Sequence, residues 1–491
     1  MKPRNIVFFI ICLLAGLALL SVLFPRGGVR IGGTTLRFPA LAEVLDVPDE
    51  PADTDSVAVL SPEEIMEQRL AVLKTEKMEE FNAYCQNDPA RLYLPGDDET
   101  YLDAFFRKMQ DAGSRHLRIL HYGDSPIECD RITGILRQEF QEEFGGCGVG
   151  LIPALQTVPT YTTSQSLTGE AEQFMAFGPA NLRGSDGFYG PMAKRTEVTG
   201  ATVSISARGG KDYSHAASFN KVTVLTRGAA RLTLTVKGDT VALDSANAGE
   251  LHFYTASLSR GASSATLGVN GHASILGIQL DGSRGVNVDN LPMRGCSGPE
   301  LLKVDRGSMR PFFARENVGL ILLQYGGNSI PYLSRKALPD YKERIKNMIG
   351  MFRQLAPEAG IIFIGPSDMA NADSTGTVTT YPVLPEAVKA LREAANESGA
   401  AFWNMYEVMG GKGSMSKWVS AGLAGSDYVH FTPAGAKKMG HMLYETLQFY
   451  YKFYRFRSGQ DKVELPEEDS LKTDNEIPPS GKRSDICDKA A

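Results

Sequence analysis

The feature that most constrains the fold of this chain is a series of short apolar segments, each followed by a helical pattern. The apolar segments cover residues 116–123, 318–326, 360–365 and 401–404, and helical patterns follow at 127–144, 340–355, 384–398 and 433–451. Strands that alternate with helices need crossover connections, which place the strands in parallel with helices on both faces of the sheet. The sequence therefore predicts an α/β fold built as three layers around a parallel sheet.

The pattern changes between the first of these helices and the second strand. Segments such as TVSISARG, KVTVLTRG and ARLTLTVKG alternate apolar residues with Thr or Ser and end at glycine turns. A period of two residues with frequent turns is typical of antiparallel strands. Residues 150–286 are therefore predicted to form an antiparallel β-sandwich. It is inserted into the α/β domain, whose two parts are residues 62–149 and 287–457.

The N-terminal residues predict a membrane segment. Residues 6–24 carry no charge and are long enough to cross a hydrocarbon core of ~30 Å as a helix. Lys2 and Arg4 precede the segment, which favours a cytoplasmic N-terminus, although Arg26 and Arg30 beyond it weaken this signal. No clear cleavage site follows, so residues 1–26 are interpreted as an uncleaved signal-anchor, with a removed signal peptide as the alternative.

The segments that flank the folded part are polar. Residues 27–61 are irregular and contain an acidic, proline-containing stretch, so they are interpreted as a tether. Residues 458–491 are acidic and polar, and they are interpreted as a disordered tail. The net charge of −6 argues against a nucleic-acid partner, which needs a basic surface to neutralise phosphates.

The strongest candidate for chemistry is the tripeptide Gly123-Asp124-Ser125. It ends the first predicted strand and precedes a helix. Sites in parallel α/β sheets form at the carboxyl ends of strands, and a nearby helix N-terminus stabilises negative charge. Ser125 is therefore the candidate nucleophile. The alternative is that Asp124 or Ser125 only caps the following helix.

A serine hydroxyl is a poor nucleophile until a base takes its proton, and that base needs a carboxylate to orient it. Asp427 and His430 lie three residues apart directly before the last predicted helix, where both side chains can face one side. His430 is the candidate base and Asp427 its orienting carboxylate. Two alternatives remain open, namely a structural histidine capped by Asp427, and His121 as the base.

Two glycine-containing turns supply candidate oxyanion donors, Gly295-Cys296-Ser297-Gly298 and Tyr325-Gly326-Gly327-Asn328-Ser329. A tetrahedral acyl intermediate needs donors aimed at the developing oxyanion. The backbone N–H groups of Ser125 and Gly298 and the side-chain amide of Asn328 would supply three. Cys296 and Cys129 are more typical of buried or disulfide-bonded cysteines than of a nucleophile. No residues show metal-ligand spacing, and neither a metal nor a cofactor is expected.

These four blocks resemble the SGNH (GDSL-like) hydrolase superfamily. GDS lies at 123–125, SG at 297–298, GGN at 326–328 and DYVH at 427–430. The resemblance implies an SGNH-type three-layer fold with Ser125 as nucleophile, Gly298 and Asn328 in the oxyanion hole, His430 as base and Asp427 as its partner. Two positions depart from the usual pattern. Ser329 stands where many members have Asp, and Pro126 directly follows the nucleophile.

A β insert behind an export segment resembles the bacterial peptidoglycan or carbohydrate O-acetylesterases. This resemblance implies a serine esterase of the cell envelope that removes acetyl groups from an acylated glycan, with its catalytic part periplasmic or extracellular. Aromatic residues of the insert, such as Tyr189 and Phe253, are either candidates for stacking on sugar rings or core residues. Two other functions remain open, a glycan O-acetyltransferase with the same triad and a non-catalytic glycan-binding protein.

Overall fold

The structure is a computed structural model that describes residues 3–23, 29–31, 34–36 and 61–461. It divides into two units, residues 1–72 and 73–491. The first unit contains helix α1 (Pro3–Leu23) and the antiparallel pair β1 (Val29–Ile31) and β2 (Thr34–Leu36). Within the residues described in full, no helix combines the length and apolar character needed to cross a bilayer. Most of the predicted tether and nearly all of the predicted tail fall outside the described residues.

Helix α3 (Pro62–Asn87) begins with a reciprocal cap. The backbone N–H of Glu64 donates to Ser61 Oγ at 3.2 Å, and the backbone N–H of Ser61 donates to Glu64 Oε2 at 2.6 Å. These bonds satisfy two N–H groups that a helix start otherwise leaves unpaired. The same hydrogen bonds hold the pKa of Glu64 below its ordinary value.

The second unit is built on the predicted parallel sheet, which is confirmed. Its strand order is β15 (Gly285–Pro292), β4 (His116–Gly123), β16 (Val318–Gln324), β17 (Gly360–Ile364), β20 (Ala401–Trp403) and β3 (Leu92–Tyr93). All neighbours pair in parallel except β3, which runs antiparallel to β20 at the edge. The register places Gly123 of β4 between Pro292 of β15 and Gln324 of β16, so the candidate serine follows a central strand.

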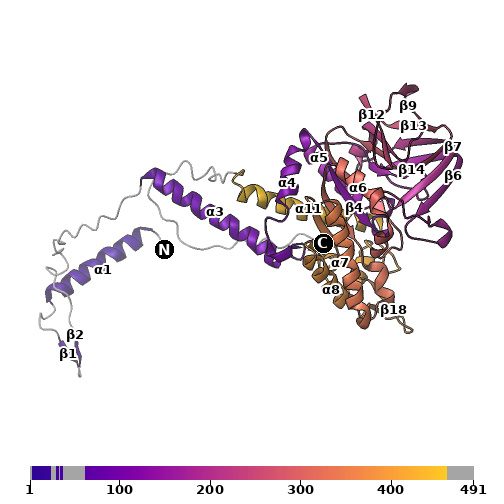
Figure 1. Cartoon of the computed structure of the whole chain (residues 1–491). Helices are drawn as coiled ribbons and strands as arrows, with labels where there is room; N and C mark the ends of the chain where they lie inside the picture. The colour runs from indigo at the N-terminus through magenta and orange to yellow at the C-terminus, as the bar shows by residue number, and fades with distance from the viewer. Residues whose placement is uncertain (1–2, 24–28, 32–33, 37–60, 462–491) are drawn as a thin grey trace. The chain divides into compact units, whose positions relative to one another are not determined.

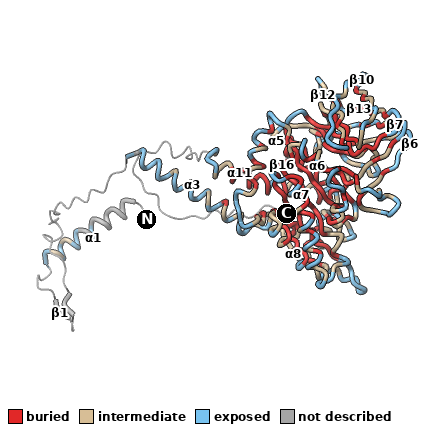
Figure 2. The backbone as a smooth tube through the Cα atoms, in the orientation of Figure 1, coloured by how far each residue is buried: buried red, intermediate tan, exposed pale blue. Residues whose placement is uncertain are grey.

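Helices cover both faces of this sheet (Figure 1). One face packs against α6 (Arg306–Arg315), α7 (Leu338–Leu355) and α8 (Leu384–Glu397), and the other against α4 (Asp103–Gln110), α5 (Thr133–Phe144) and α11 (Pro433–Arg457). Strand β16 shows why, because Ile321 and Leu323 face the first layer and Leu320 and Leu322 face the second. Figure 2 shows β16 buried, as the apolar sequence of this strand predicts.

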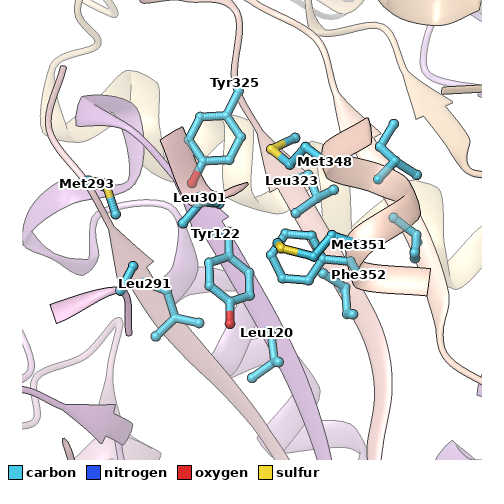
Figure 3. Close-up of a cluster of buried hydrophobic side chains, with 14 of the residues drawn as sticks. Leu120, Tyr122, Leu291, Met293, Leu301, Leu323, Tyr325, Met348, Met351 and Phe352 are labelled. Atoms are coloured by element: carbon cyan, nitrogen blue, oxygen red, sulfur yellow. The ribbon is translucent and has the colours of Figure 1, made fainter. Parts of the chain in front are cut away.

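The first layer holds large aromatic side chains against the central strands (Figure 3). The ring of Tyr122 on β4 lies 4.8 Å from that of Phe352 on α7, between their centroids. The Tyr122 hydroxyl donates to the backbone oxygen of Pro191 at 2.8 Å, so this buried hydroxyl has a partner. Because Pro191 lies between β6 and β7 of the insert, this bond ties the parallel sheet to the insert.

The insert consists of antiparallel strands, as predicted. They are β5 (Gly150–Ile152), β6 (Thr163–Met175), β7 (Lys194–Ala207), β8 (Phe219–Arg227), β9 (Leu232–Val236), β10 (Asp239–Val241), β11 (Asp244–Ala248), β12 (Leu251–Ala262), β13 (Ser264–Val269) and β14 (His272–Asp281). All belong to one hydrogen-bonded sheet, in which β7 pairs with β14 between two sets of strands. Val203 and Leu267 from one set share a hydrophobic cluster with Val222 and Ile278 from the other. The two sets therefore enclose a common core while remaining joined.

A buried cluster of charges connects the insert to the parallel sheet. Arg118 of β4 contacts Asp281 of β14 at 2.5 Å, Asp289 of β15 at 2.7 Å and Glu316 at 3.0 Å. Burial opposes the charge of Arg118, but the three carboxylates outweigh it and raise its pKa. The last strand of the insert is thereby fixed beside β4.

Candidate active site

The helix predicted at residues 127–144 begins later than expected. Residues Ser125–Asp130 form a 3-10 turn, and α5 starts only at Thr133. The reason is the backbone of Cys129 and Asp130, whose φ angles of 65° and 66° lie in the left-handed region that α-helices exclude. The Asp130 carboxylate is held by Arg137 and by the Thr162 hydroxyl, both at 2.6 Å, so the turn is anchored. Ser125 therefore stands at the start of a rigid turn.

The structure brings Ser125, His430 and Asp427 together. Ser125 Oγ lies 3.0 Å from His430 Nε2, and His430 Nδ1 lies 2.8 Å from Asp427 Oδ2. Both distances are within ordinary hydrogen-bonding range. If Nδ1 carries the proton and donates a hydrogen bond to Asp427, Nε2 is free to accept the serine proton. This arrangement matches the geometry that a nucleophile, a base and an orienting carboxylate require.

Local hydrogen bonds fix the loop that carries this carboxylate. The other oxygen of Asp427 accepts the backbone N–H groups of Val429 and His430, each at 3.0 Å. Tyr428, which lies between Asp427 and Val429, has a φ of 57°, and this left-handed conformation turns the chain tightly enough for these bonds. Partial burial of Asp427 opposes its charge, yet the bonds from His430 and Val429 lower the pKa below its ordinary value. Asp427 is therefore a carboxylate at neutral pH.

The pair is open to water. The side chains of His430 and Asp427 are 46% and 51% exposed, whereas Ser125 is half-buried. Ser125, His430 and Asn328 line one pocket at the carboxyl end of the sheet. Pro126, Pro366, Met369 and Met405 give this pocket apolar walls. The pocket thus combines apolar walls with an exposed base.

Two of the three predicted oxyanion donors, the Gly298 N–H and the Asn328 amide, are bonded within the protein. The Asn328 amide nitrogen donates to Asp124 Oδ2 at 2.5 Å and to the Cys296 carbonyl at 3.1 Å. The Gly298 N–H donates to Cys296 Sγ at 3.3 Å. The structure therefore brings Asn328 to the pocket, while an oxyanion would have to take these donors from their present acceptors.

Gly298 has two reasons to be glycine. Its φ of 105° is a conformation that side chains rarely adopt. A Cβ there would also lie 3.1 Å from Tyr325 Cγ and 3.2 Å from Met348 Sδ. The SG block thus positions its backbone closely against α7 and against Tyr325, the residue that follows β16.

Asp124 is a residue whose role the sequence did not reveal. Its side chain is 3% exposed, and burial raises the pKa of its carboxyl to about 8, although the hydrogen bond from Asn328 opposes this rise. Tyr325, Tyr341 and Cys296 lie near the carboxyl, and none of them carries a positive charge. The carboxyl is therefore mainly neutral at pH 7.

The competing candidates from the sequence lie elsewhere in the fold. His121 is buried, with ring nitrogens 3.0 Å from Gln324 Oε1 and from Thr133 Oγ1, and burial lowers its pKa to about 4. It is a core histidine and not a base for Ser125. Cys129 and Cys296 are both unpaired thiols, and burial raises the pKa of Cys296 well above its usual range. Phe253 and Tyr189 are buried in the core.

An exposed aromatic residue that the sequence analysis did not single out lies beside the pocket. Tyr332 lines it and is 90% exposed. It ends the 3-10 turn Gly327–Tyr332 that begins in the GGN block. The only sequence feature that could have pointed to it is its place in the segment SIPY, directly after this block. In the part of the chain that the structure describes, no group of three or more His, Cys, Asp and Glu side chains is arranged to hold a metal ion.

Comparison with known proteins shows a family to which part of the chain is similar. Residues 256–438 match the GDSL-like Lipase/Acylhydrolase family, a range that includes Gly298, Asn328, Asp427 and His430 and starts after Ser125. This part of the chain is similar to the hydrolases of that family. No curated protein sequence matches the chain.

A solved structure shares the fold of this chain. A structure described as "Peptidoglycan O-acetylesterase in action, 5 min" is 23% identical, with a TM-score of 0.58, and the match covers 71% of this chain and 96% of that one. A family two carbohydrate esterase from Clostridium thermocellum in complex with cellohexaose is 14% identical, with a TM-score of 0.28, and the match covers 57% and 98%.

Proposed function

We propose that this protein is a serine esterase that removes O-acetyl groups from a cell-wall or other extracellular glycan. The observation that carries the proposal is the continuous hydrogen-bonded chain from Ser125 through His430 to Asp427 at the mouth of a small, partly apolar pocket. The SGNH fold and its similarity to a peptidoglycan O-acetylesterase support an ester of this kind as substrate.

In the proposed reaction, Ser125 Oγ attacks the ester carbonyl while His430 Nε2 takes the hydroxyl proton. Asp427 stabilises the resulting imidazolium through its bond to Nδ1. The tetrahedral oxyanion is stabilised by N–H donors of Ser125, Gly298 and Asn328. His430 then returns the proton to the leaving sugar oxygen, which leaves an acetyl group on Ser125.

Water completes the cycle. His430 takes a proton from a water molecule, the hydroxide attacks the acetyl-serine, and acetate leaves as Ser125 regains its proton. The exposure of His430 and Asp427 favours this hydrolytic second half, because water reaches the base directly. A transferase with the same triad would need a sugar hydroxyl to compete with that water.

The proposed location is the cell envelope, with the N-terminal segment as a membrane anchor and the hydrolase outside the cytoplasm. The support is the uncharged segment 6–24 and the exposure of its large side chains in α1, among them Leu19 at 60% and Leu23 at 70%. Fractionation of cells that express the full chain tests this. Recovery in the membrane fraction is expected, and recovery after washing in the soluble fraction would contradict the anchor.

The test of the activity compares acetate release by the full chain from O-acetylated peptidoglycan and from acetylated xylan, with Ser125→Ala as control. Release from peptidoglycan that the variant lacks is the expected result. Release from xylan alone would keep the serine mechanism and change the glycan. No release of acetate from either glycan, together with a gain of acetyl groups on the glycan when an acyl donor is added, would identify a transferase. Glycan binding without turnover would point to a binding protein.

A further inference from the structure

A second cavity lies where the β insert meets the parallel sheet. Its volume is about 290 Å³, and its walls include Met192 and Lys194 of the insert, Pro292 and Arg294 at the end of β15, and Glu128 in the turn after Ser125. A water molecule needs about 10–15 Å³ of such space, so this cavity has room for a much larger polar group. Nothing in the proposed ester chemistry uses it.

This cavity lies one strand away from the candidate nucleophile. Pro292 of β15 pairs directly with Gly123 of β4, two residues before Ser125. The backbone N–H of Met293 donates to the Gly123 oxygen at 2.8 Å, and Glu128 follows Ser125 by three residues. Neighbouring strands are about 4.8 Å apart, so a substrate bound at Ser125 is close enough to place a neighbouring group in the cavity.

The charges in the cavity are unevenly paired. Arg137 forms an ion pair with Asp130 at 2.6 Å, and Arg294 forms one with Glu128. Lys194 is the fifth charged residue that lines the cavity. Its Nζ donates to the Pro292 oxygen at 3.4 Å, and among the described residues no carboxylate lies within ion-pair distance of it. The lining thus carries three cations and two carboxylates, with the ammonium of Lys194 left over.

The surroundings of this ammonium make it a strong site for an anion. Lys194 is half-buried beside the apolar side chains of Met192, Met175 and Phe177, which also line the cavity. Charge interactions are stronger in such partly dry surroundings than in water. Burial lowers the pKa of Lys194, and Glu128 opposes this shift only through space. An anionic ligand would restore the partner that the ammonium lacks.

We infer that this cavity binds a carboxylate of the substrate, with Lys194 as its counter-ion, while the ester is held at Ser125. The inference rests on the proposed function for its substrate class. A carboxylate of a cell-wall glycan has two sources, the lactyl ether of its muramic acid and the attached peptide. A neutral acetylated glycan such as xylan has neither.

The experiment measures binding, so it does not depend on turnover. The Ser125→Ala chain is titrated by calorimetry with N-acetylmuramic acid, with muramyl dipeptide and with N-acetylglucosamine, which carry a lactyl carboxylate, a peptide carboxylate and no carboxylate. The double variant Ser125→Ala/Lys194→Met is titrated in the same way. Loss of one charge-assisted hydrogen bond is expected to weaken binding of a carboxylated sugar about tenfold or more.

Controls separate charge from structure. Lys194→Arg keeps the positive charge and is expected to retain most of the affinity. Lys237→Met removes a lysine from an exposed turn of the same insert and serves as the matched control. Thermal unfolding of each variant shows whether the insert is intact, and Lys194→Met is expected to unfold at no lower temperature, because burial penalises the charge that it removes.

Each result has a definite meaning. Weaker binding of N-acetylmuramic acid in the Lys194→Met background assigns the cavity to the lactyl carboxylate, and weaker binding of muramyl dipeptide assigns it to the peptide carboxylate. Equal affinities in both backgrounds, or no preference of the Ser125→Ala chain for the carboxylated sugars, would overturn the inference. Failure of acetate release from both peptidoglycan and xylan would contradict the proposed function, whereas this binding measurement does not depend on turnover and would still be decided by its own outcome.

Discussion

The side-chain amide of Asn328 donates a hydrogen bond to the buried carboxyl of Asp124, the residue directly before the candidate nucleophile. Asp124, a titratable acceptor, therefore contacts Asn328, a candidate oxyanion donor. While the Asp124 carboxyl is protonated, it competes only weakly with the oxyanion for the hydrogen bond of the Asn328 amide. Once it ionises, its negative charge lies close to the position where the oxyanion would form, and it opposes the second negative charge.

We expect activity to fall as the pH rises through about 8, because burial raises the pKa of Asp124 to about that value. The Asp124→Asn variant keeps an oxygen acceptor for Asn328 and removes the ionisation. Its kcat is expected to lack this alkaline decline. The measurement is the pH profile of kcat on a soluble acetyl ester for both proteins, and an unchanged decline in the variant would contradict the assignment.

The same carboxyl predicts a pH-dependent stability. Above the ordinary pKa of 3.8 the unfolded chain ionises Asp124, whereas the folded chain keeps its proton until about pH 8. The folded state then binds more protons, so its stabilisation is complete below pH 3.8 and is lost as the pH rises through about 8. Urea unfolding at pH 5 and pH 9 is expected to show a loss of at least about 1.4 kcal/mol that Asp124→Asn lacks.

Tyr332 is expected to position the glycan. Its ring is 90% exposed at the pocket that Ser125 lines, where a sugar ring can pack against it. Loss of a well-placed tyrosine contact costs roughly 1–2 kcal/mol, so Tyr332→Ala is expected to raise KM for the acetylated glycan about tenfold.

Two comparisons test this role. Tyr332→Phe keeps the ring and is expected to keep the KM of the wild type. Hydrolysis of 4-nitrophenyl acetate, which has no sugar ring, is expected to be affected far less by Tyr332→Ala than hydrolysis of the glycan. Equal losses on both esters would show that Tyr332 acts on the pocket itself and not on the sugar.

The buried charges between the insert and the sheet predict a large effect on stability. Arg118→Leu leaves Asp281, Asp289 and Glu316 without their cation, and breaking a buried pair in this way costs about 3–5 kcal/mol. Arg335→Leu is the matched control, because Arg335 forms an exposed pair with Glu386, and loss of an exposed ion pair changes the free energy of unfolding little. Urea unfolding measures both, and equal effects would contradict a structural role for the buried cluster.

His430 and Asp427 are expected to contribute unequally. His430→Ala removes the base and should lower kcat nearly as much as loss of the nucleophile, whereas Asp427→Ala is expected to lower it ten- to a hundredfold less. Asp427 acts through His430, so its variant is also expected to shift the pH profile of kcat. Steady-state kinetics on 4-nitrophenyl acetate measure the kcat of both variants and the pH profile of Asp427→Ala. An Asp427→Ala variant with the wild-type profile would leave Asp427 only a structural role.

Strands and helices with strong periodicity were predictable from the sequence. The strand at 116–123 and the helix that starts at 384 have the expected positions because their apolar patterns are regular. The helix expected from 127 was wrong at its start, because Cys129 and Asp130 adopt left-handed backbone conformations that their residue types do not announce. Asp130 holds this conformation through contacts with Arg137, seven residues later, and with Thr162 of the insert, which lies 32 residues later.

The candidate site divides in the same way. Ser125, Asp427 and His430 were predictable because short motifs carry them, one at the end of β4 and the other shortly before α11, and their catalytic roles remain predictions. The neutral state of Asp124 and the unpaired ammonium of Lys194 were not, because both depend on burial created by distant segments. The occupied state of the Asn328 amide likewise depends on Cys296, which another strand end supplies.

The most direct test of the account is the kcat of Ser125→Ala on 4-nitrophenyl acetate, measured beside the wild-type chain. If Ser125 is the nucleophile of a serine esterase, the variant is expected to lose roughly 10⁴–10⁶ in kcat while it unfolds at the same temperature as the wild type. A folded Ser125→Ala variant with wild-type activity would contradict the central claim.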